Sequence, residues 1–402
     1  MVVYRNIQNT HRPTTTSLTL VIKVGTSSIC DEVTHYPLLG NLSRIVETII
    51  QLKRMGHRVV LVTSAAVGTG LRRLNMSEKP KKLASIQAIA AVGQGRLMSM
   101  YDDLFGQFNQ PVAQILLTRN DLADRGQYLN AVNCLEELLD MGVVPIINEN
   151  DSISVKEIKF GDNDTLSAIS AGMVKADYLF LMTDVDCLYT DNPRSNPDAR
   201  PVLVCDDIEE LRKQITVSAP GSSLGTGGMV TKLVAADLAT AAGVTTVIAR
   251  GATPENIIPI IDSSSTDPKK LPLHTRFVAK PKPLMDRKWW ILHGLHTAGT
   301  VYVEGEDIKN AIHDGQLDSS LFAHSICKVE GTFVEHQAVR LVLRNKNAQG
   351  IIDNITVAKG IVNYSSQEIM RIMLAKESTI IDSLGYKDAD CIIHRDNMAI
   401  SV

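Results

Sequence analysis

Several protein classes are excluded by what this sequence lacks. Its 402 residues include six cysteines, yet no two of them form a Cys-x-x-Cys pair, and the histidines do not cluster with them. Zinc sites and disulfide frameworks need such closely spaced ligands, so buried free thiols in a reducing compartment are expected instead. The His-Glu-x-x-His motif of zinc proteases is missing as well. No metal-ligating residues are therefore predicted.

Long apolar runs and a strong net charge are also missing. No apolar run approaches the roughly 18 residues of a membrane-spanning helix, and the first residues hold no apolar signal-peptide core. The net charge of −3 argues against a general binder of nucleic acids or membrane surfaces, although it leaves room for a local basic patch. A cytoplasmic protein is the simplest interpretation, with a short transit peptide as the alternative.

Length and composition predict two folded domains. A chain of 402 residues with 44% hydrophobic and 21% charged residues can bury a sizeable core. Prolines, serines and basic residues then gather between residues 263 and 288. We therefore expect a tail over 1–16, a first domain over 17–262, a linker over 263–288 and a second domain over 289–402.

The first domain alternates predicted strands with predicted helices, which favours an α/β fold with a mostly parallel sheet covered by helices on both faces. In the helix 124–139, Leu129, Leu135 and Leu139 are among the side chains expected to face inward. The expected strands are 17–25, 58–63, 112–118, 142–147, 177–184 and 244–249, and the main expected helices are 41–55, 82–105, 124–139, a segment opened by 161–164, 208–214, and a helix that follows 225–232 and ends at 242.

The second domain is expected to be smaller and mainly β. A helix should start at Ser365, because Glu368 three residues later gives the spacing of a capping box. A second short helix is expected over 307–313. The strand-like runs are 299–303, 325–329, 338–343, 350–358 and 391–393.

Acidic and amide side chains crowd the segment 144–165, VPIINENDSISVKEIKFGDNDT. One cluster, 148–151, ends a predicted strand, and another, 161–164, opens a predicted helix. Open α/β sheets bind ligands where the carboxyl ends of strands meet the amino ends of helices. A polar loop capped by Asp162 is the alternative, but capping accounts for only one aspartate.

Two segments that combine lysine with glycine could hold a phosphate. Lys23 comes just before Gly25 at the end of a predicted strand, where an ammonium and bare backbone N–H groups can face an anion. The segment 225–232, GTGGMVTK, opens a helix with Lys232 about one turn in. Neither segment is a Walker A loop or a Rossmann fingerprint. A lysine that snorkels to the surface and a flexible glycine–serine loop are the alternatives.

Thr183 and Asp184 add a cluster at the end of another predicted strand. An acid there can bind Mg²⁺, hydrogen-bond a ribose or an amine, or simply cap a loop. Together the clusters predict phosphoryl transfer without a P-loop. Two lysines would neutralise the transferred group, glycine N–H groups would hold phosphates, and an aspartate would orient the lysines.

The motifs that carry these clusters resemble those of the glutamate 5-kinases, which have an amino-acid-kinase fold, here followed by a PUA-like domain. The resemblance runs from about residue 17 to the end of the chain. It rests on IKVGTSS, AVGQGRLM, LLTRNDLADRGQYLNA, VVPIINENDS, KFGDNDTLSA, LMTDVDCLYT, DNPRSNP and GTGGMVTKL, and on GIVNYSSQEI, LGY and HRDNM in the second domain.

This resemblance implies an enzyme that uses ATP and Mg²⁺ to phosphorylate the side-chain carboxylate of L-glutamate, the first step of proline biosynthesis. Lys23 and Lys232 would stabilise the transferring phosphoryl group, and Asp164 would hold both lysines. Mg²⁺ would be held mainly by the nucleotide phosphates. Ser64, Asp151 and Asn163 would bind glutamate, with Asp151 taking its ammonium. The nucleotide would be bound by Lys23, Gly25, Thr183, Asp184, Thr226, Gly227, Gly228, Met229 and Lys232.

The resemblance further implies inhibition by proline near the glutamate site, and a homo-oligomer is expected. Residues 152–160 are expected to form a flap over the site. The sequence leaves two alternatives: another kinase of this fold, acting for example on aspartate or acetylglutamate, and RNA binding by the PUA-like domain. The segment FGDNDTLSA and the second domain argue against the first. The second domain has no basic run with interleaved aromatics, which argues against RNA.

One departure from the family pattern follows Ser64. The family usually has Ser-Gly-Ala or Ser-Gly-Gly, whereas this chain has Ala65 and Ala66. A Cβ at this place could narrow the glutamate pocket or disfavour a turn with positive φ. We therefore expect turnover and substrate fit to be affected, and the fold to be unaffected.

Overall fold

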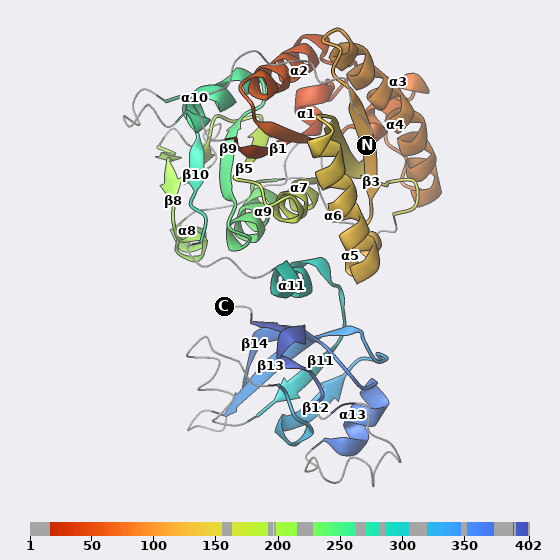
Figure 1. The fold of residues 1–402 in the computed structure, drawn as a ribbon, viewed down its shortest axis with the longest axis vertical. Coiled ribbons are helices and arrows are strands. Elements are labelled where there is room, and N and C mark those ends of the chain that lie inside the picture. The colour runs from red at the N-terminus through yellow and green to blue at the C-terminus, as the bar shows by residue number, and fades with distance from the viewer. Residues whose placement is uncertain are drawn as a thin grey trace. The chain divides into compact units, whose positions relative to one another are not determined.

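The computed structural model describes residues 17–154, 163–191, 196, 198–214, 228–262, 271–280, 286–304, 320–346, 352–373, 389 and 391–400. The chain divides into two compact units, Met1–Pro283 and Leu284–Val402. Each unit has its own main sheet and its own hydrophobic core (Figure 1). No helix in the described part of the chain is long and apolar enough to cross a membrane.

The sheet of the first unit has the strand order β3-β4-β2-β1-β5-β9-β10-β8. Neighbouring strands from β3 to β9 run parallel, as the alternation of strands and helices predicts. The strands are β1 (Thr19–Val24), β2 (Arg58–Val62), β3 (Val112–Leu117), β4 (Val144–Glu149), β5 (Tyr178–Thr183), β8 (Val204–Cys205), β9 (Thr245–Arg250) and β10 (Thr275–Phe277), with a separate ribbon of β6 (Leu188–Tyr189) and β7 (Pro201–Val202).

Strand β10 lies inside the range 263–288 that we expected to be a linker. It pairs antiparallel with β9 and parallel with β8, so this part of the range belongs to the first sheet. Strand β4 also differs from the expectation, because it continues through Asn148 and Glu149. The first polar cluster therefore begins within the strand, and only its second half forms the turn that follows.

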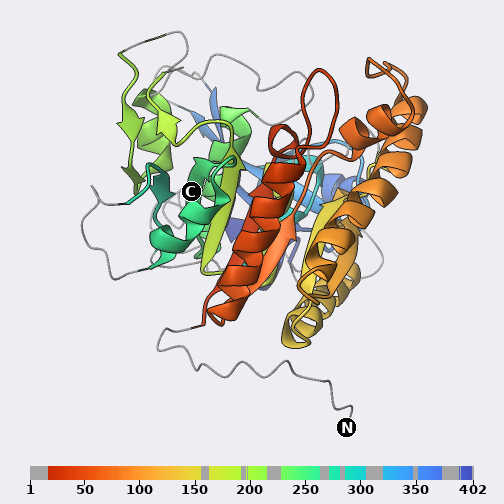
Figure 2. The same ribbon diagram turned by 90° about the horizontal axis from the view of Figure 1, so that it is seen from above.

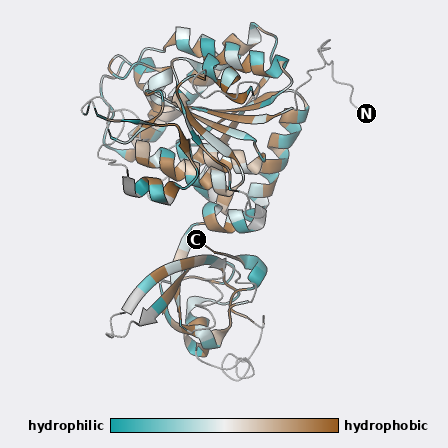
Figure 3. Ribbon diagram, turned by 90° about the vertical axis from the view of Figure 1, so that its left-hand side faces the viewer, coloured by the Kyte–Doolittle hydropathy of each residue, from teal (hydrophilic) through white to brown (hydrophobic). Residues whose placement is uncertain are grey.

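Helices cover both faces of the sheet (Figures 1 and 3). Helices α2 and α4 lie on one face, and α7 and α9 lie on the other; Figure 2 shows α2 and α4 from above. The helices of this unit are α1 (Thr26–Ile29), α2 (Leu39–Arg54), α3 (Ala66–Arg73), α4 (Leu83–Gly106), α5 (Arg119–Ala123), α6 (Arg125–Asp140), α7 (Asn163–Met173), α8 (Ile208–Gln214), α9 (Met229–Ala241) and α10 (Ile257–Ile261).

The period of two along β1 decides where its lysine goes. Leu20, Ile22 and Val24 belong to the core cluster that contains the apolar face of α2. Successive side chains of a strand point to opposite faces, so Lys23 points to the face covered by α7. A lysine buried under a helix is costly unless it finds an anionic partner. We therefore expect a carboxylate on the helix that covers this face of β1.

Burial along α6 confirms that Leu135 and Leu139 face inward, but the expectation for Leu129 was wrong. Leu129 is 42% exposed, and Tyr128 is buried in its place. Positions 128, 135 and 139 lie seven and eleven residues apart, which matches one face of a helix better than a stripe starting at 129. Asp124 caps this helix by accepting a hydrogen bond from the backbone N–H of Gln127, at 2.8 Å.

Glycines let α3 and α4 approach backbone to backbone. A Cβ at Gly93 would lie 1.7 Å from the carbonyl oxygen of Ala66, and a Cβ at Gly70 would lie 2.0 Å from that of Ile89. Gly93 is thus a point of close approach between the two helices, whereas a Cβ at Gly95 would have no atom within 4 Å. This contact holds the amino end of α3 in place, directly after the turn that contains Ser64.

The second unit is mainly β, as expected. Its sheet has the order β12-β11-β13-β14-β15, with β11 and β13 parallel and the other pairs antiparallel. Its elements are α11 (Asp286–Trp289), a π-helical turn (Trp290–Gly294), β11 (Thr297–Val303), β12 (Ile326–Glu330), β13 (Ala338–Lys346), β14 (Ile352–Ile361), α13 (Ser366–Ile372) and β15 (Met398–Ile400).

The capping box of α13 is confirmed. Ser365 accepts from the backbone N–H of Glu368, and the Glu368 carboxylate accepts from the backbone N–H of Ser365 at 2.7 Å. The expected strand 391–393 forms only an isolated bridge between Ile393 and Leu321, while β15 follows it unpredicted. The helix expected over 307–313 lies outside the described residues.

Candidate active site

Three charged residues from distant parts of the chain meet between β1, α7 and α9. The Asp164 Oδ1 atom lies 2.6 Å from Lys23 Nζ, and its Oδ2 atom lies 3.1 Å from Lys232 Nζ. The Asp164 side chain is 0% exposed, and the two lysine side chains are 6% and 7% exposed. The structure therefore brings together all three residues that the sequence pointed to as a catalytic group.

The electrostatics of this group centre on Asp164. Burial alone would raise the pKa of this carboxyl, but the ammonium groups of Lys23 and Lys232 hold it well below its usual range. The Thr231 hydroxyl adds a hydrogen bond to Oδ2 at 2.9 Å. Two ammonium groups and one carboxylate leave the three residues with a formal charge of +1. A buried excess of positive charge is suited to an anionic ligand.

Gly25 keeps space open beside Lys23. Its φ is −79° and its ψ is 165°, so its backbone conformation would accept any residue. A Cβ built there would lie 3.7 Å from Lys23 Nζ, in the region where a ligand oxygen would meet the ammonium. Glycine at this position therefore leaves open space beside the Lys23 ammonium, and the turn itself does not require it.

A buried amide network joins two of the residues expected to bind glutamate. The Asn163 Nδ2 atom lies 3.0 Å from each of Ser64 Oγ, the Thr63 carbonyl oxygen and Asn148 Oδ1. These contacts join the first residue of α7 to the ends of β2 and β4. The Oδ1 atom of Asn163 is buried and has no hydrogen-bond partner in the described part of the protein. It is a buried acceptor whose hydrogen-bonding capacity these residues leave unused.

Asp151 lies in the turn after β4 and lines a cavity of about 250 Å³. The walls of this cavity come from the start of α3, the middle of α4, β3 and the turn itself. Its lining residues are Ala66, Ala90, Ala91, Gln94, Gly95, Gln114, Leu116, Glu149, Asn150, Asp151 and Ser152. Asp151 thus contributes a carboxylate to a small cavity beside the α3 amino end, whereas Ser64 and Asn163 are not part of its wall.

Only the start of the predicted flap 152–160 can be placed. Ser154 is buried; its hydroxyl donates to Glu149 Oε1 at 2.8 Å, and its carbonyl accepts from Gln87 Nε2 at 3.1 Å. Residues 155–160, and Asp162 with its expected capping role, lie outside the described residues. The first residues of the segment are therefore anchored to the body of the unit.

Ala65 occupies a conformation that favours glycine. Its φ is +77° and its ψ is 13°, in the left-handed region, and it is the residue that precedes α3. The side chain is 7% exposed. The departure from the family pattern therefore falls on a turn with positive φ, one of the two possibilities raised by the sequence, and this turn follows Ser64 directly.

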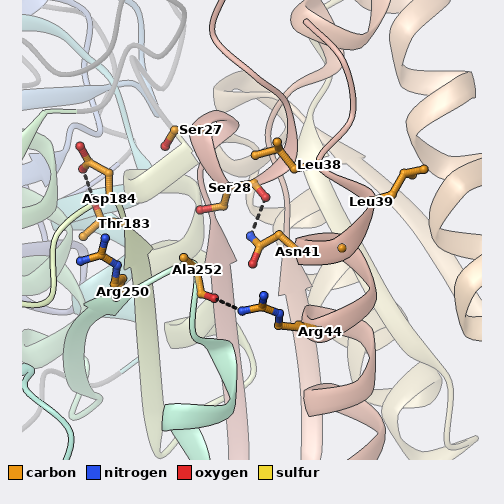
Figure 4. A pocket seen from close by; sticks show the side chains of 11 residues that line it. Ser27, Ser28, Leu38, Leu39, Asn41, Arg44, Thr183, Asp184, Arg250 and Ala252 are labelled. Atoms are coloured by element: carbon orange, nitrogen blue, oxygen red, sulfur yellow. Dashed lines mark hydrogen bonds between the residues drawn. The ribbon is translucent and has the colours of Figure 1, made fainter.

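Thr183 and Asp184 line a second cavity, of about 450 Å³ (Figure 4). The hydroxyl of Thr183 donates to Asp184 Oδ1 at 3.1 Å, and both residues stand at the carboxyl end of β5. Arg44 and Arg250 enter the same cavity from α2 and β9. Arg44 donates to the carbonyl oxygen of Ala252 at 2.9 Å. Arg250 pairs with Asp186 at 3.2 Å, so Arg44 is the guanidinium of this cavity that has no carboxylate partner among the described residues, and it suits a ligand that carries phosphate.

The segment expected to bind nucleotide phosphates is described from residue 228 onward. Gly228 is the residue that precedes α9, and Met229 begins the helix. The amino end of α9 presents backbone N–H groups and the positive end of the helix dipole. Thr226 and Gly227 lie outside the described residues. Among the residues that are described, no three His, Cys, Asp or Glu side chains converge to hold a metal ion.

Two residues that the sequence argument did not select belong to the site. Asn148 is 1% exposed, accepts from Asn163 and donates to Gln94 Oε1 at 2.8 Å, so it orients the amide of Asn163. Thr231 binds Asp164 as described above. Asn148 could have been found from its place in the first polar cluster. Nothing in the sequence indicates that Thr231 would reach Asp164.

Comparisons with known proteins show which proteins this chain is similar to. A model of the amino acid kinase family matches residues 19–250. A probable glutamate 5-kinase of Schizosaccharomyces pombe is 50% identical over 394 residues, which cover 97% of this chain and 95% of that protein. A glutamate 5-kinase of a Cyanothece species is 48% identical over 383 residues, 95% of this chain and 99% of that protein. Among solved structures, an isopentenyl phosphate kinase substrate complex matches 65% of this chain and 99% of its own at 18% identity, with a TM-score of 0.45.

Proposed function

The chain belongs to the amino acid kinase family and, within it, to the glutamate 5-kinases, and on that premise we propose that the Lys23–Asp164–Lys232 group is its phosphoryl-transfer centre. The protein is a kinase. In the proposed reaction it transfers the γ-phosphoryl group of ATP to the side-chain carboxylate of L-glutamate, the first step of proline biosynthesis. The observation that carries this proposal is the buried contact of both lysines with one aspartate.

The proposed reaction needs charge neutralisation more than proton transfer. A carboxylate oxygen of glutamate bonds to the γ-phosphorus, and the bond from that phosphorus to the bridging oxygen of the β-phosphate breaks, so ADP leaves. The attacking carboxylate is already ionised, because its ordinary pKa is about 4.3. No general base is required. Lys23 and Lys232 would offset the negative charge on the transferring group and on the leaving oxygen.

Asp164 acts in this proposal as the anchor of the two lysines. Its lowered pKa keeps it ionised throughout the neutral range, and each of its oxygens already faces an ammonium. It is therefore a poor candidate for a general base. It is an equally poor candidate for a Mg²⁺ ligand, so we place Mg²⁺ on the nucleotide phosphates. An anchor of this kind holds the ammonium groups in position before the substrates arrive, which avoids reorganisation during the reaction.

Ser64, Asn163 and Asp151 are proposed to bind glutamate. The free Oδ1 acceptor of Asn163 and the carboxylate of Asp151 are both suited to the α-ammonium group of an amino acid. The Asn148 side chain supports this role by holding the Asn163 amide. Ser64 supplies a hydroxyl at the end of β2, beside the same amide.

The nucleotide is proposed to lie at the carboxyl ends of β1, β5 and β9. Lys23, Gly25 and Lys232 would face its phosphates, together with the segment Thr226–Met229 at the start of α9. Thr183 and Asp184 would contact it from the cavity of Figure 4. The proposal also includes a cytoplasmic homo-oligomer and inhibition by proline at the glutamate site, both supported by membership of the family alone. Adding proline to the assay below tests the inhibition.

The experiment that tests the proposed function combines a substrate panel with one variant. Acyl phosphate is trapped as a hydroxamate after incubation with ATP, Mg²⁺ and either glutamate, aspartate or acetylglutamate. Glutamate should be the preferred acceptor, and product from aspartate but not glutamate would refute the assignment. Lys232→Ala should lower kcat by about two orders of magnitude or more, because it removes a charge that faces the transferring group.

Lys280→Ala serves as the control for that variant. Its side chain is 51% exposed, and its ammonium pairs with Asp237 at the surface. Loss of this charge should leave kcat unchanged. Activity of Lys232→Ala within a few-fold of the control would reduce Lys232 to a structural role.

A further inference from the structure

A third cavity, of about 310 Å³, lies at the far end of α3 from Ser64. Its walls come from the loop before α2, the last turn of α3 and the middle of α4. Its lining residues are His35, Pro37, Thr69, Arg72, Arg73, Asn75, Arg96 and Met100. None of these residues belongs to the site proposed above. Three arginines and a histidine thus share a cavity that the proposed reaction does not use.

The three arginines have no carboxylate partner in the described part of the chain. Arg72 donates to the Tyr36 hydroxyl at 2.6 Å and to Asn75 Oδ1 at 3.3 Å, and its guanidinium lies 3.9 Å from the centre of the Tyr36 ring. Arg96 has a weak contact with the Ser99 hydroxyl at 3.4 Å. Arg73 forms no hydrogen bond or ion pair with any described residue.

The Asp31 carboxylate, in the loop before α2, already has hydrogen-bond partners within that loop. Asp31 Oδ1 accepts hydrogen bonds from the backbone N–H groups of Val33 and Thr34, and from the Thr34 hydroxyl at 2.7 Å. These contacts fold the loop back on itself and hold the pKa of Asp31 below its ordinary value. The Asp31 carboxylate therefore stabilises the loop. The three arginine charges of the cavity remain close together and repel one another.

His35 adds a second observation. The residue is 5% exposed and has a left-handed φ of +58°. Its Nε2 atom lies 3.3 Å from the carbonyl oxygen of Ser77, which suits an Nε2–H donor. Its Nδ1 atom is buried without a hydrogen-bond partner in the described part of the protein. With Nε2–H as the donor, Nδ1 of the neutral ring is an acceptor, which a hydroxyl or another donor group of a ligand would satisfy.

Helix electrostatics explain only part of this arrangement. Arg72 and Arg73 lie in the last turn of α3, where cations interact favourably with the negative end of the helix dipole. The interaction with the helix dipole would be equally favourable if the Arg72 and Arg73 side chains pointed to solvent. It does not account for Arg96, which comes from the middle of α4, or for the buried His35. Convergence from three elements needs a different cause.

We propose that this cavity binds a small oxyanion-bearing metabolite through Arg72, Arg73 and Arg96. Guanidinium groups recognise phosphate and carboxylate by paired, charge-assisted hydrogen bonds, and the volume admits more than a single phosphate group. Thr69 and Asn75 offer further polar contacts. The site is separate from the proposed glutamate and nucleotide sites, so ligand binding here does not depend on the proposed function.

Isothermal titration calorimetry on the full chain tests the proposal. Pyrophosphate and citrate are the two probes, and ADP with Mg²⁺ is present at saturation to mask the nucleotide site. Binding of pyrophosphate alone identifies a phosphorylated ligand, and binding of citrate alone identifies a polycarboxylate. Both outcomes support an oxyanion site, and so does binding of both probes. If neither pyrophosphate nor citrate binds at millimolar concentration, the proposal is overturned.

Variants separate this site from general charge effects. Arg73→Gln with Arg96→Gln should weaken binding by about tenfold or more, as expected when charge-assisted hydrogen bonds are lost. Arg54→Gln with Arg371→Gln removes the same charge elsewhere and should leave affinity unchanged. The single variant Arg73→Gln alters an exposed side chain that has no described partner, so it should fold normally and still bind more weakly. Equal affinity in all variants would refute the proposal.

Discussion

Replacing Asp164 by asparagine should destabilise the first unit more than removing either lysine. The substitution leaves two ammonium groups, buried to more than nine-tenths, without their shared carboxylate. Breaking a buried ion pair in this way costs about 3–5 kcal/mol, because a charge stays behind in a poorly solvated place. Lys23→Met leaves Asp164 paired with Lys232, a neutral combination. Its cost should therefore be clearly smaller, although phosphoryl transfer should be lost in both variants.

Urea unfolding followed by far-ultraviolet circular dichroism measures this difference. Both tryptophans lie in the second unit, so tryptophan fluorescence would not report on the first one directly. The midpoint for Asp164→Asn should fall below that for Lys23→Met, with similar slopes for the two variants. Equal midpoints, or a more stable Asp164→Asn variant, would refute the account of Asp164 as the shared anchor of two buried cations.

The pH dependence of the same experiment follows from the lowered pKa of Asp164. A carboxyl whose pKa is lower in the folded state stabilises the fold at every pH above its unfolded value of about 3.9. This contribution disappears as the pH falls from there through the lower folded pKa. The stability gap between the wild type and Asp164→Asn should therefore be constant near pH 7 and shrink below about pH 4. A gap that shrinks already between pH 8 and pH 6 would point to another group.

Three further variants test individual positions. Gly25→Ala should keep the fold but lower kcat/KM for ATP about tenfold or more, because the added methyl would lie 3.7 Å from Lys23 Nζ; unchanged kinetics would show that no phosphate approaches there. Ala65→Gly relieves about 1–2 kcal/mol of left-handed strain, but loses a buried methyl worth about 0.8 kcal/mol and adds about 0.4–1 kcal/mol of unfolded-chain entropy. The free energy of unfolding of Ala65→Gly should thus change by less than about 1 kcal/mol. A few-fold rise in kcat/KM for glutamate in steady-state assays would therefore be a direct effect on the site. No rise would mean that the Ala65 methyl does not affect glutamate turnover. Asp184→Asn should raise KM for ATP several-fold and leave KM for glutamate unchanged; the reverse pattern in the same assays would reassign the residue.

Local sequence patterns were sufficient for much of the fold and for the two lysine–glycine segments, whereas the role of Asp164 came from the resemblance to a family. The alternation along β1, the apolar face of α2 and the capping box at Ser365 are short-range features, set by neighbouring residues and the period of each element. Lys23, Asp164 and Lys232 each stand at the junction of a strand or helix with a glycine-rich or acidic segment. Such junctions can be recognised because glycine and carboxylates at the ends of strands and helices are typical of ligand-binding sites.

Other properties depended on how the elements pack. Tyr128 is buried where Leu129 was expected, because tertiary packing decides which face of α6 is covered. Strand β10 belongs to the first sheet although it lies in an expected linker, because long-range strand pairing decides this. Asn148 became a hub only because β4 lies beside β2 and under the start of α7.

The sequence by itself determined which residues could do the chemistry, since side-chain type and local period are written into it. The tertiary structure alone decided that one carboxylate lies between two lysines, that a left-handed turn follows Ser64, and that three arginines converge without a carboxylate partner among the described residues. These are distances and backbone angles between elements far apart in the chain. They follow from strand order and helix packing, which local patterns do not specify.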